Sequence, residues 1–186
     1  MADVYLPADS QRRLIRISRE ALEDFVRGRF GSQPESSDPY LDTSDYGAFV
    51  TFFKDDELQD CIGRCVPTDA LWCTVIEMTE VAAARDRRMT PVSADELEQV
   101  PMDVSVMSPL EQASDSLSPI IGEHGLQIGR KGKRGVLLPQ VATEREWDMK
   151  TFLEQTCVKA QLPKNLRRWP DTMVCSCTAL IIEEEG

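Results

Sequence analysis

Two segments of the chain carry side chains that could do chemistry together. Leu58-Gln-Asp-Cys-Ile-Gly63 places the thiol of Cys61 just before a glycine, and Gly122-Glu-His-Gly125 holds His124, the single histidine of the chain. A thiol attacks as a nucleophile when a nearby base takes its proton, so Cys61 and His124 form a candidate catalytic pair. The alternative is that Cys61 is a small buried side chain on a strand and that His124 orients a turn.

The spacing of the cysteines argues against a metal site. Cys61 and Cys65, and Cys175 and Cys177, are four and two residues apart, so each pair faces one way along its strand. A tetrahedral zinc site needs four ligands at compact loop spacing, and the chain contains no C-x-x-C pair. The three-cysteine spacing of an iron–sulfur radical enzyme is also missing. We therefore expect no metal and no cofactor.

The charge of the chain limits its partners. Its 186 residues include 32 acidic and 21 basic side chains, a net charge of −11, which repels nucleic acid and anionic lipid. The basic cluster Arg130–Arg134 could touch phosphate, but we interpret it as the solvated turn of a hairpin. No stretch approaches the roughly 20 apolar residues of a membrane helix. We expect a cytoplasmic protein with its six cysteines as thiols and no nucleic-acid or membrane partner.

The elements that position these residues follow from periodicity. Apolar residues spaced by three and four predict a helix over 10–27 that packs on the body of the protein. Then follow, in the same order twice, a hairpin, a helix and a strand: 47–65, 69–86 and 102–107, and after them 125–139, 146–160 and 173–182. Residue identity between the halves is negligible, so an internal duplication and independent halves both remain open.

This order predicts an α+β fold. Two β-β-α-β units, over about 45–110 and 120–184, would form antiparallel sheets flanked by helices, with a groove where they meet. We expect Asp69 to cap the helix over 69–86. The capping-box pattern Thr143-Glu-Arg-Glu146 predicts the start of the helix over 146–160.

Several segments in this order resemble the AMMECR family. Most specific are the runs HGLQI from His124, GVLLPQVATEREWD from Gly135 and FLEQTCVKA from Phe152. The family signature is Leu-Arg-Gly-Cys-Ile-Gly, and here Gln59 and Asp60 stand in place of its Arg and Gly. An Arg beside a thiol would lower the thiol pKa, whereas an Asp acts in the opposite sense. The departure therefore weakens any activity that rests on that arginine.

The resemblance implies one domain over 8–186, built of two subdomains with a groove between them. It makes Gly63, Asp86, Gln140 and Glu144 candidate binding residues, because they lie in or beside the segments that carry it; Asp86 falls in Asp86-Arg-Arg-Met89, an altered form of a family motif. Members of the family often occur with Memo-type proteins and radical S-adenosylmethionine enzymes. A protein of either class is therefore the expected partner.

Two functions remain as expectations. The first is a binding module or accessory protein that acts through the groove between the subdomains. The second is a thiol-dependent enzyme that uses Cys61 and His124. Convergence of Cys61, His124 and Gln140 on one surface would favour a shared site.

Overall fold

The protein has an α+β fold with two antiparallel four-stranded sheets, as predicted. The computed structural model describes residues 3–29, 37–54, 57–85, 97, 100–113, 115, 117–165 and 171–184. The chain divides into two compact units, each described by itself. We call Val4–Met107 with Leu180–Gly186 unit A, and Met1–Asp3 with Ser108–Ala179 unit B.

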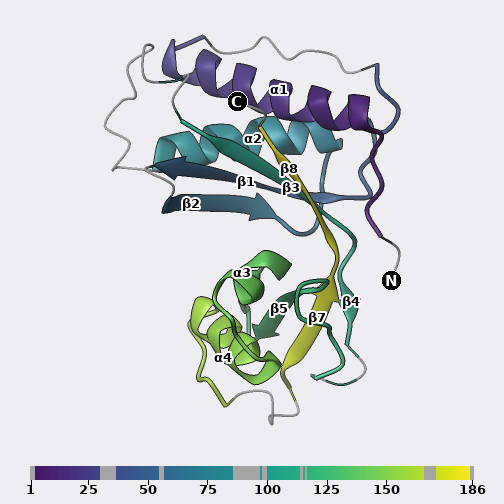
Figure 1. Ribbon diagram of the computed structural model, residues 1–186, viewed down its shortest axis with the longest axis vertical. Helices are drawn as coiled ribbons and strands as arrows, with labels where there is room; N and C mark the ends of the chain where they lie inside the picture. The colour runs from purple at the N-terminus through teal and green to yellow at the C-terminus, as the bar shows by residue number, and fades with distance from the viewer. Residues whose placement is uncertain are drawn as a thin grey trace. The chain divides into compact units, whose positions relative to one another are not determined.

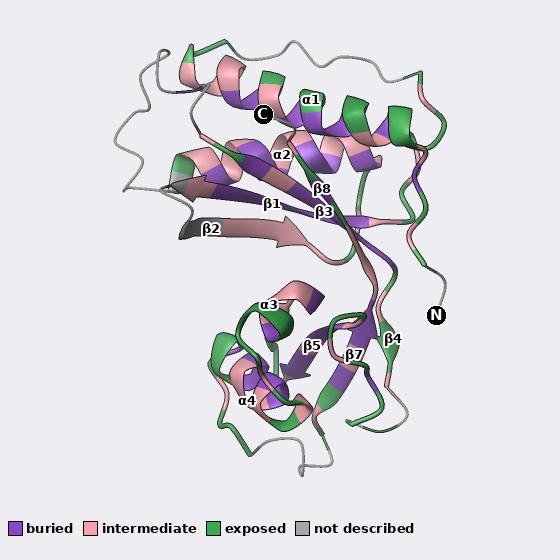
Figure 2. Cartoon of the chain, viewed as in Figure 1, coloured by how far each residue is buried: buried purple, intermediate pink, exposed green. Residues whose placement is uncertain are grey.

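Unit A is a sheet covered on one face by two helices. Its elements are α1 (Ala8–Val26), β1 (Gly47–Lys54), β2 (Glu57–Arg64), α2 (Leu71–Arg85), β3 (Met102–Met107) and β8 (Ala179–Glu183). The sheet, called sheet A, has the strand order β2-β1-β3-β8, and Figure 1 shows α1 and α2 on the same side of it. Alternate strand residues such as Val50, Val104 and Ile182 pack against Leu14 and Val75 of the helices. The core therefore lies between sheet and helices, where Figure 2 is purple.

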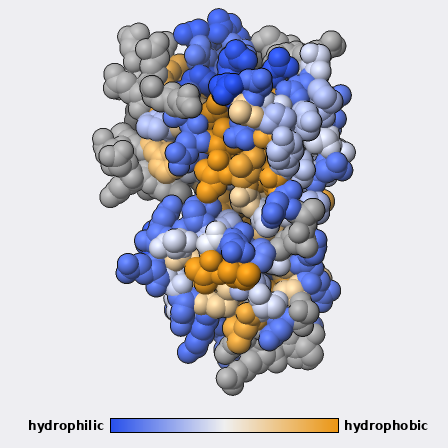
Figure 3. All heavy atoms as spheres, turned by 45° about the vertical axis from the view of Figure 1, so that its right-hand side comes forward, coloured by the Kyte–Doolittle hydropathy of each residue, from blue (hydrophilic) through white to orange (hydrophobic). Residues whose placement is uncertain are grey.

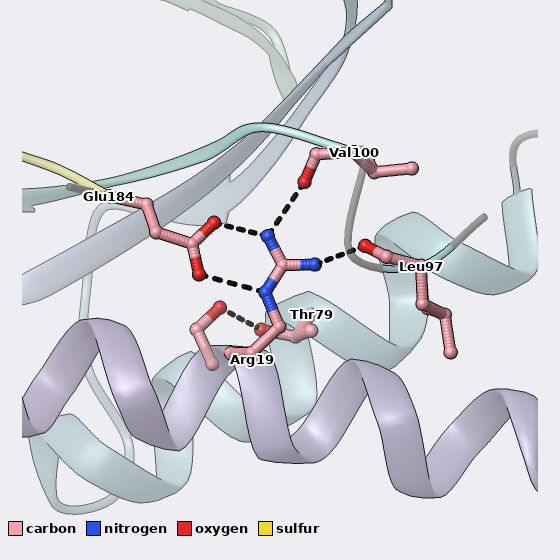
Figure 4. A network of polar contacts seen from close by, with 6 residues as sticks. Arg19, Thr79, Leu97, Val100 and Glu184 are labelled. Atoms are coloured by element: carbon pink, nitrogen blue, oxygen red, sulfur yellow. Dashed lines mark hydrogen bonds and ion pairs between the residues drawn. The ribbon is translucent and has the colours of Figure 1, made fainter. Parts of the chain in front are cut away.

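Arg19 of α1 forms hydrogen bonds to three residues of other segments in unit A. The Arg19 guanidinium pairs with both carboxylate oxygens of Glu184, which follows β8, and donates to the carbonyl oxygens of Leu97 and Val100 at 2.7 Å each. Figure 4 shows this fork together with Thr79, whose hydroxyl bonds Ser18. Three segments far apart in sequence thus meet at one fixed charge.

Unit B contains the second sheet, sheet B, with the strand order β4-β7-β5-β6. Its elements are β4 (Glu111–Gln112), β5 (Gly125–Arg130), β6 (Lys133–Leu137), α3 (Pro139–Glu144), α4 (Met149–Lys159) and β7 (Met173–Cys177). Leu126, Ile128 and Val174 pack against Phe152 and Leu153 of α4. One face of sheet B is therefore covered by a helix, as in sheet A.

The two units share their strand order. In each, the first hairpin strand is central, with the second strand on one side and the strand after the helix on the other, all antiparallel. The chain then exchanges sheets: β3 of sheet A leads to β4 of sheet B, and β7 of sheet B leads to β8 of sheet A. Ser108 and Thr178 follow these two equivalent strands and bond each other, since each backbone N–H donates to the other residue.

The exchange corrects one prediction. The single strand expected over 173–182 is two strands in different sheets, so Leu180–Gly186 belongs with the first unit rather than the second. The expected connection over 110–123 also contains the short strand β4. Alternation of side chains predicts that a segment is extended, but it carries no signal for the sheet that each part joins.

Two helix starts differ from the prediction. Thr143 and Glu144 close the unpredicted helix α3, and α4 begins after Asp148, whose carboxylate accepts the Thr151 N–H at 2.7 Å. At α2, the N–H groups of Leu71 and Trp72 donate to backbone carbonyls of the segment before β1, rather than to an Asp69 side chain. No helix of the described residues is long and apolar enough to span a membrane.

Candidate functional site

Sheet A has one face that its helices leave open. Because α1 and α2 pack on the face of Val50 and Val104, alternate residues of each strand point the other way. We call this the helix-free face, and define it by seven residues: Phe49, Thr51, Cys61, Gly63, Asp103, Ser105 and Ile181. Cys61 of the sequence motif therefore points away from the helical core.

A row of polar side chains crosses three strands of this face. Thr51 of β1 lies opposite Cys61 of β2 and also opposite Asp103 of β3. Directly opposed residues on one face have Cβ atoms about 5 Å apart, so thiol, hydroxyl and carboxylate lie side by side. Cys61 and Asp103 are half-buried and Thr51 is 4% exposed. We call Cys61, Thr51 and Asp103 the polar row.

The neighbouring row explains why the motif needs a glycine. Gly63 lies opposite Phe49, and a Cβ added to Gly63 would come within 2.1 Å of the Phe49 ring. The aromatic ring therefore fills the space that a side chain would occupy. Ser105 lies on the far side of Phe49; it is 1% exposed, and its hydroxyl has no hydrogen-bond partner in the described part of the chain. Gly63, predicted as a binding residue, serves here to seat Phe49 beside the polar row.

The backbone of the motif is irregular. Phe52 pairs with Asp60 while Phe53 pairs with Leu58, so Gln59 is an extra residue in β2. Such a bulge bends a strand and turns the residues beyond it. The extra residue, Gln59, stands where the family signature has its arginine, two residues before Cys61.

His124 closes a turn in unit B. Its ring Nδ1 accepts the Ile120 N–H at 2.8 Å, and its own N–H donates to the Ile120 carbonyl at 2.9 Å. Because Nδ1 accepts, the ring proton of the neutral form must lie on Nε2. The Nε2 atom is then a donor and not a ready base. His124 thus holds this turn through its ring nitrogen, and its role as a base for Cys61 stays a prediction.

Gln140 and Glu144 lie on α3, next to this turn. A Cβ on Gly122 would come within 3.3 Å of the Thr143 hydroxyl, which places the end of α3 beside the turn. The Oε1 atom of Gln140 is buried without a hydrogen-bond partner among the described residues, and Glu144 is exposed. An unbonded buried acceptor is costly unless a donor from water or a ligand meets it.

The six predicted site residues thus fall in different places. Cys61 and Gly63 lie on sheet A, whereas His124, Gln140 and Glu144 lie together in unit B. Asp86 lies outside the described residues. Since each unit is described by itself, the groove and the pairing of Cys61 with His124 stay predictions.

Among the described residues, Cys73 and Cys175 have raised thiol pKa values. Burial raises the pKa of Cys73, with further increases from Asp69 and Asp42. Burial also raises the pKa of Cys175, and Arg134 lowers it by less. A raised pKa leaves less of the reactive thiolate at neutral pH, so neither thiol is activated as a nucleophile.

Thr51, Asp103 and Ser105 belong to no motif of the sequence. Because side chains alternate along a strand, the sequence alone indicates that Asp103 and Ser105 share one face of their strand, and that Thr51 shares a face with Phe49. The register that aligns Thr51 with Cys61 and Asp103 joins three separate segments. That register depends on tertiary pairing, so only the structure brings them together.

The chain is similar in sequence and in fold to known proteins of one family. The AMMECR1 family matches residues 15–178. A protein of Methanothermobacter thermautotrophicus is 38% identical over 187 residues, covering 97% of each chain. One of Thermococcus gammatolerans is 38% identical, covering 92% of this chain and 89% of its own. The crystal structure of an uncharacterized protein from Pyrococcus horikoshii matches with a TM-score of 0.88 and 30% identity, over 97% of this chain and 94% of that one.

Proposed function

Because the chain belongs to the AMMECR1 family, we propose that it is a binding or accessory protein whose helix-free face on sheet A recognises a partner. The observation that carries the proposal is the polar row, in which Cys61, Thr51 and Asp103 are aligned across three adjacent strands. A rigid sheet holds such groups in fixed positions, so little side-chain entropy is lost when they bind.

The chemistry of the face suits a protein surface. The half-buried Asp103 carboxylate can accept hydrogen bonds, and Ile181 at the edge strand is 36% exposed. Polar groups beside an apolar edge are typical of interfaces. Figure 3 shows a patch of apolar surface beside polar residues in unit A, the upper part of the view.

Non-covalent recognition fits this face better than thiol catalysis. A nucleophilic cysteine needs a base with an available lone pair, and the neutral ring of His124 has its Nδ1 lone pair engaged by Ile120. The residue beside Cys61 is Asp60 where the family has Gly, after Gln59 where it has Arg, so the motif lacks the cation that would favour a thiolate. The polar row then contributes hydrogen bonds rather than a reaction.

The partner we propose is a Memo-type protein or a radical S-adenosylmethionine enzyme, the classes with which the family is associated. The test is to co-express the chain with each protein from the same organism and to measure the affinity of any complex by calorimetry. Asp103→Ala and Cys61→Ala should each weaken the complex by about tenfold or more, because central interface residues carry most of the affinity. The matched control is Cys175→Ala in β7, on the face of sheet B opposite the core residue Val174, which should leave the affinity unchanged.

Two results would count against the proposal. One is that neither protein class forms a complex with the chain. The other is that Cys175→Ala weakens a complex as much as the two variants on sheet A. Thermal unfolding of each variant shows whether the affinity or the fold has changed.

A further inference from the structure

Positive charge is concentrated in two segments of unit B. Residues 124–143 and 155–170 together contain eight Lys and Arg and no Asp or Glu, whereas the whole chain has 21 basic and 32 acidic residues. An even distribution would place several carboxylates in these segments. These two segments are therefore basic, although the chain as a whole is acidic.

The fold brings residues 130–135 of the first segment next to residues 159–161 of the second. The Lys133 Nζ donates to the Gln161 carbonyl at 3.1 Å, and a Cβ on Gly135 would come within 2.4 Å of the Ala160 nitrogen. The β5–β6 turn and the C-terminal end of α4 are thus in contact. We call this surface the basic end of unit B, and it consists of six residues: Arg130, Lys131, Lys133, Arg134, Lys159 and Lys164.

Most of these cations lack a carboxylate partner. Arg130 pairs with Asp171 at 2.8 Å, and this contact holds the pKa of the Asp171 carboxyl below its ordinary value. Within the described residues, no ion pair joins Lys131, Arg134, Lys159 or Lys164, which are all exposed. In unit A, by contrast, arginines are paired with carboxylates along the chain: Arg12, Arg13, Arg19, Arg27, Arg29 and Arg64. Asp171 also feels the charge of Lys131, so Arg134, Lys159 and Lys164 are the cations of the basic end that carry no ion pair and no such interaction in the described part of the chain.

The basic end is also held rigidly. Lys131 and Gly132 both have positive φ angles, 50° and 82°, as a tight two-residue hairpin turn requires. The Arg130–Asp171 pair and the Lys133–Gln161 hydrogen bond anchor the two sides of this turn. A surface whose backbone is already ordered loses little entropy on binding.

We propose that the basic end of unit B docks a carboxylate-rich segment of a partner protein. Separate ammonium and guanidinium groups on a turn and a helix end match separate carboxylates. A nucleic acid fits this surface less well, because none of its six described residues is aromatic, so they offer no ring on which a base could stack. This proposal rests on unit B alone and stands apart from the helix-free face of sheet A.

The test is fluorescence anisotropy with the full chain and a labelled peptide that alternates Glu with Ala. The peptide should bind at low ionic strength and be released at about 1 M salt, where the screening length falls to about 3 Å. Lys131→Glu with Arg134→Glu should weaken binding by at least about tenfold, since two attractive contacts become repulsive. Lys159→Glu with Lys164→Glu should act in the same direction. The matched control is Arg145→Glu with Lys150→Glu, two exposed cations of unit B outside the basic end, which should change binding by less than about twofold.

Four results would overturn the proposal. The first is that the peptide fails to bind. The second is that the control weakens binding as much as the test variants. The third is that a single-stranded oligonucleotide of the same length binds more tightly than the peptide. The fourth is salt-dependent self-association of the chain that the Lys131→Glu, Arg134→Glu variant abolishes, because a second copy would then be the occupant.

Discussion

Gly63 shows how one residue shapes the helix-free face. The Phe49 ring lies over it, and Phe49 itself is paired with Ser105 of the next strand. A larger residue would push the ring away and change the surface beside Cys61. The glycine of the motif therefore acts through packing, although its sequence position first indicates close approach of a ligand.

Gly63→Ala should lower the free energy of unfolding by about 1–3 kcal/mol, as overpacking of a filled site does. The added methyl group would lie 2.1 Å from the Phe49 ring, so the ring or the strand has to move. Urea denaturation measures the change. Gly63→Ala combined with Phe49→Leu should recover part of the loss, because the smaller side chain leaves room.

Gly129→Ala is the matched control, since a Cβ there would meet Arg134 at an ordinary distance of 3.5 Å. It should change the free energy of unfolding by less than about 1 kcal/mol. Equal effects of Gly63→Ala and Gly129→Ala would show that the Phe49 contact is not the cause.

At the scale of elements, the sequence predicts most helices and strands but few of their ends. Both hairpins, the strand over 102–107 and three helices are found as predicted, because their apolar periodicity reflects which face is buried. Helix α3 was missed, since a six-residue helix is too short to show periodicity. The capping pattern at Thr143 was misleading because Asp148 offers a competing cap closer to the apolar face of α4.

Asp148→Ala should lower the melting temperature at neutral pH, because the carboxylate accepts the Thr151 N–H at the start of α4. The hydrogen bonds from Thr151, first from its side chain and then from its backbone, hold the pKa of Asp148 below 3.8. A depressed carboxyl pKa stabilises the fold above the ordinary value, and this contribution is lost as the pH falls through the folded pKa. The difference between Asp148→Ala and the unaltered chain should therefore shrink below about pH 3.8.

Asp148→Asn keeps the oxygen acceptor without the charge, so its melting temperature should lie between the other two and vary less with pH. Differential scanning calorimetry across this pH range makes the comparison. A melting temperature of Asp148→Ala equal to that of the unaltered chain at neutral pH would contradict the capping role.

At the scale of the molecule, the main feature is the exchange of strands between the two sheets. Three strands have the same order in each sheet, β2-β1-β3 and β6-β5-β7. The fourth strand of each sheet follows the third strand of the other sheet in the chain: β8 follows β7, and β4 follows β3. The repeated order of elements predicted the similarity of the halves. The exchange could not be predicted, since a sequence of alternating residues does not encode which sheet supplies its neighbours.

Arg19 links the last strand to the first helix, so it stabilises unit A through residues at both ends of the sequence. Arg19→Lys should lower the free energy of unfolding by about 2–4 kcal/mol, because a lysine cannot reach Glu184 and the carbonyls of Leu97 and Val100 together. Arg27→Lys is the control; Arg27 forms an exposed pair with Glu23 one helical turn away. It should cost less than about 0.5 kcal/mol. Similar losses in both variants would show that the fork in Figure 4 contributes little.

The central claim is that a partner covers the polar row of sheet A, and thiol footprinting tests it most directly. The alkylation rates of Cys61 and Cys175 by iodoacetamide are measured by mass spectrometry with and without a saturating proposed partner. Both thiols are half-buried; Cys61 lies on the helix-free face of sheet A, and Cys175 lies on the face of sheet B opposite the core residue Val174. We predict that the bound partner slows alkylation of Cys61 by about tenfold or more and leaves Cys175 unchanged, because interface cores exclude solvent. An unchanged Cys61 rate in the presence of a bound partner would contradict the proposal.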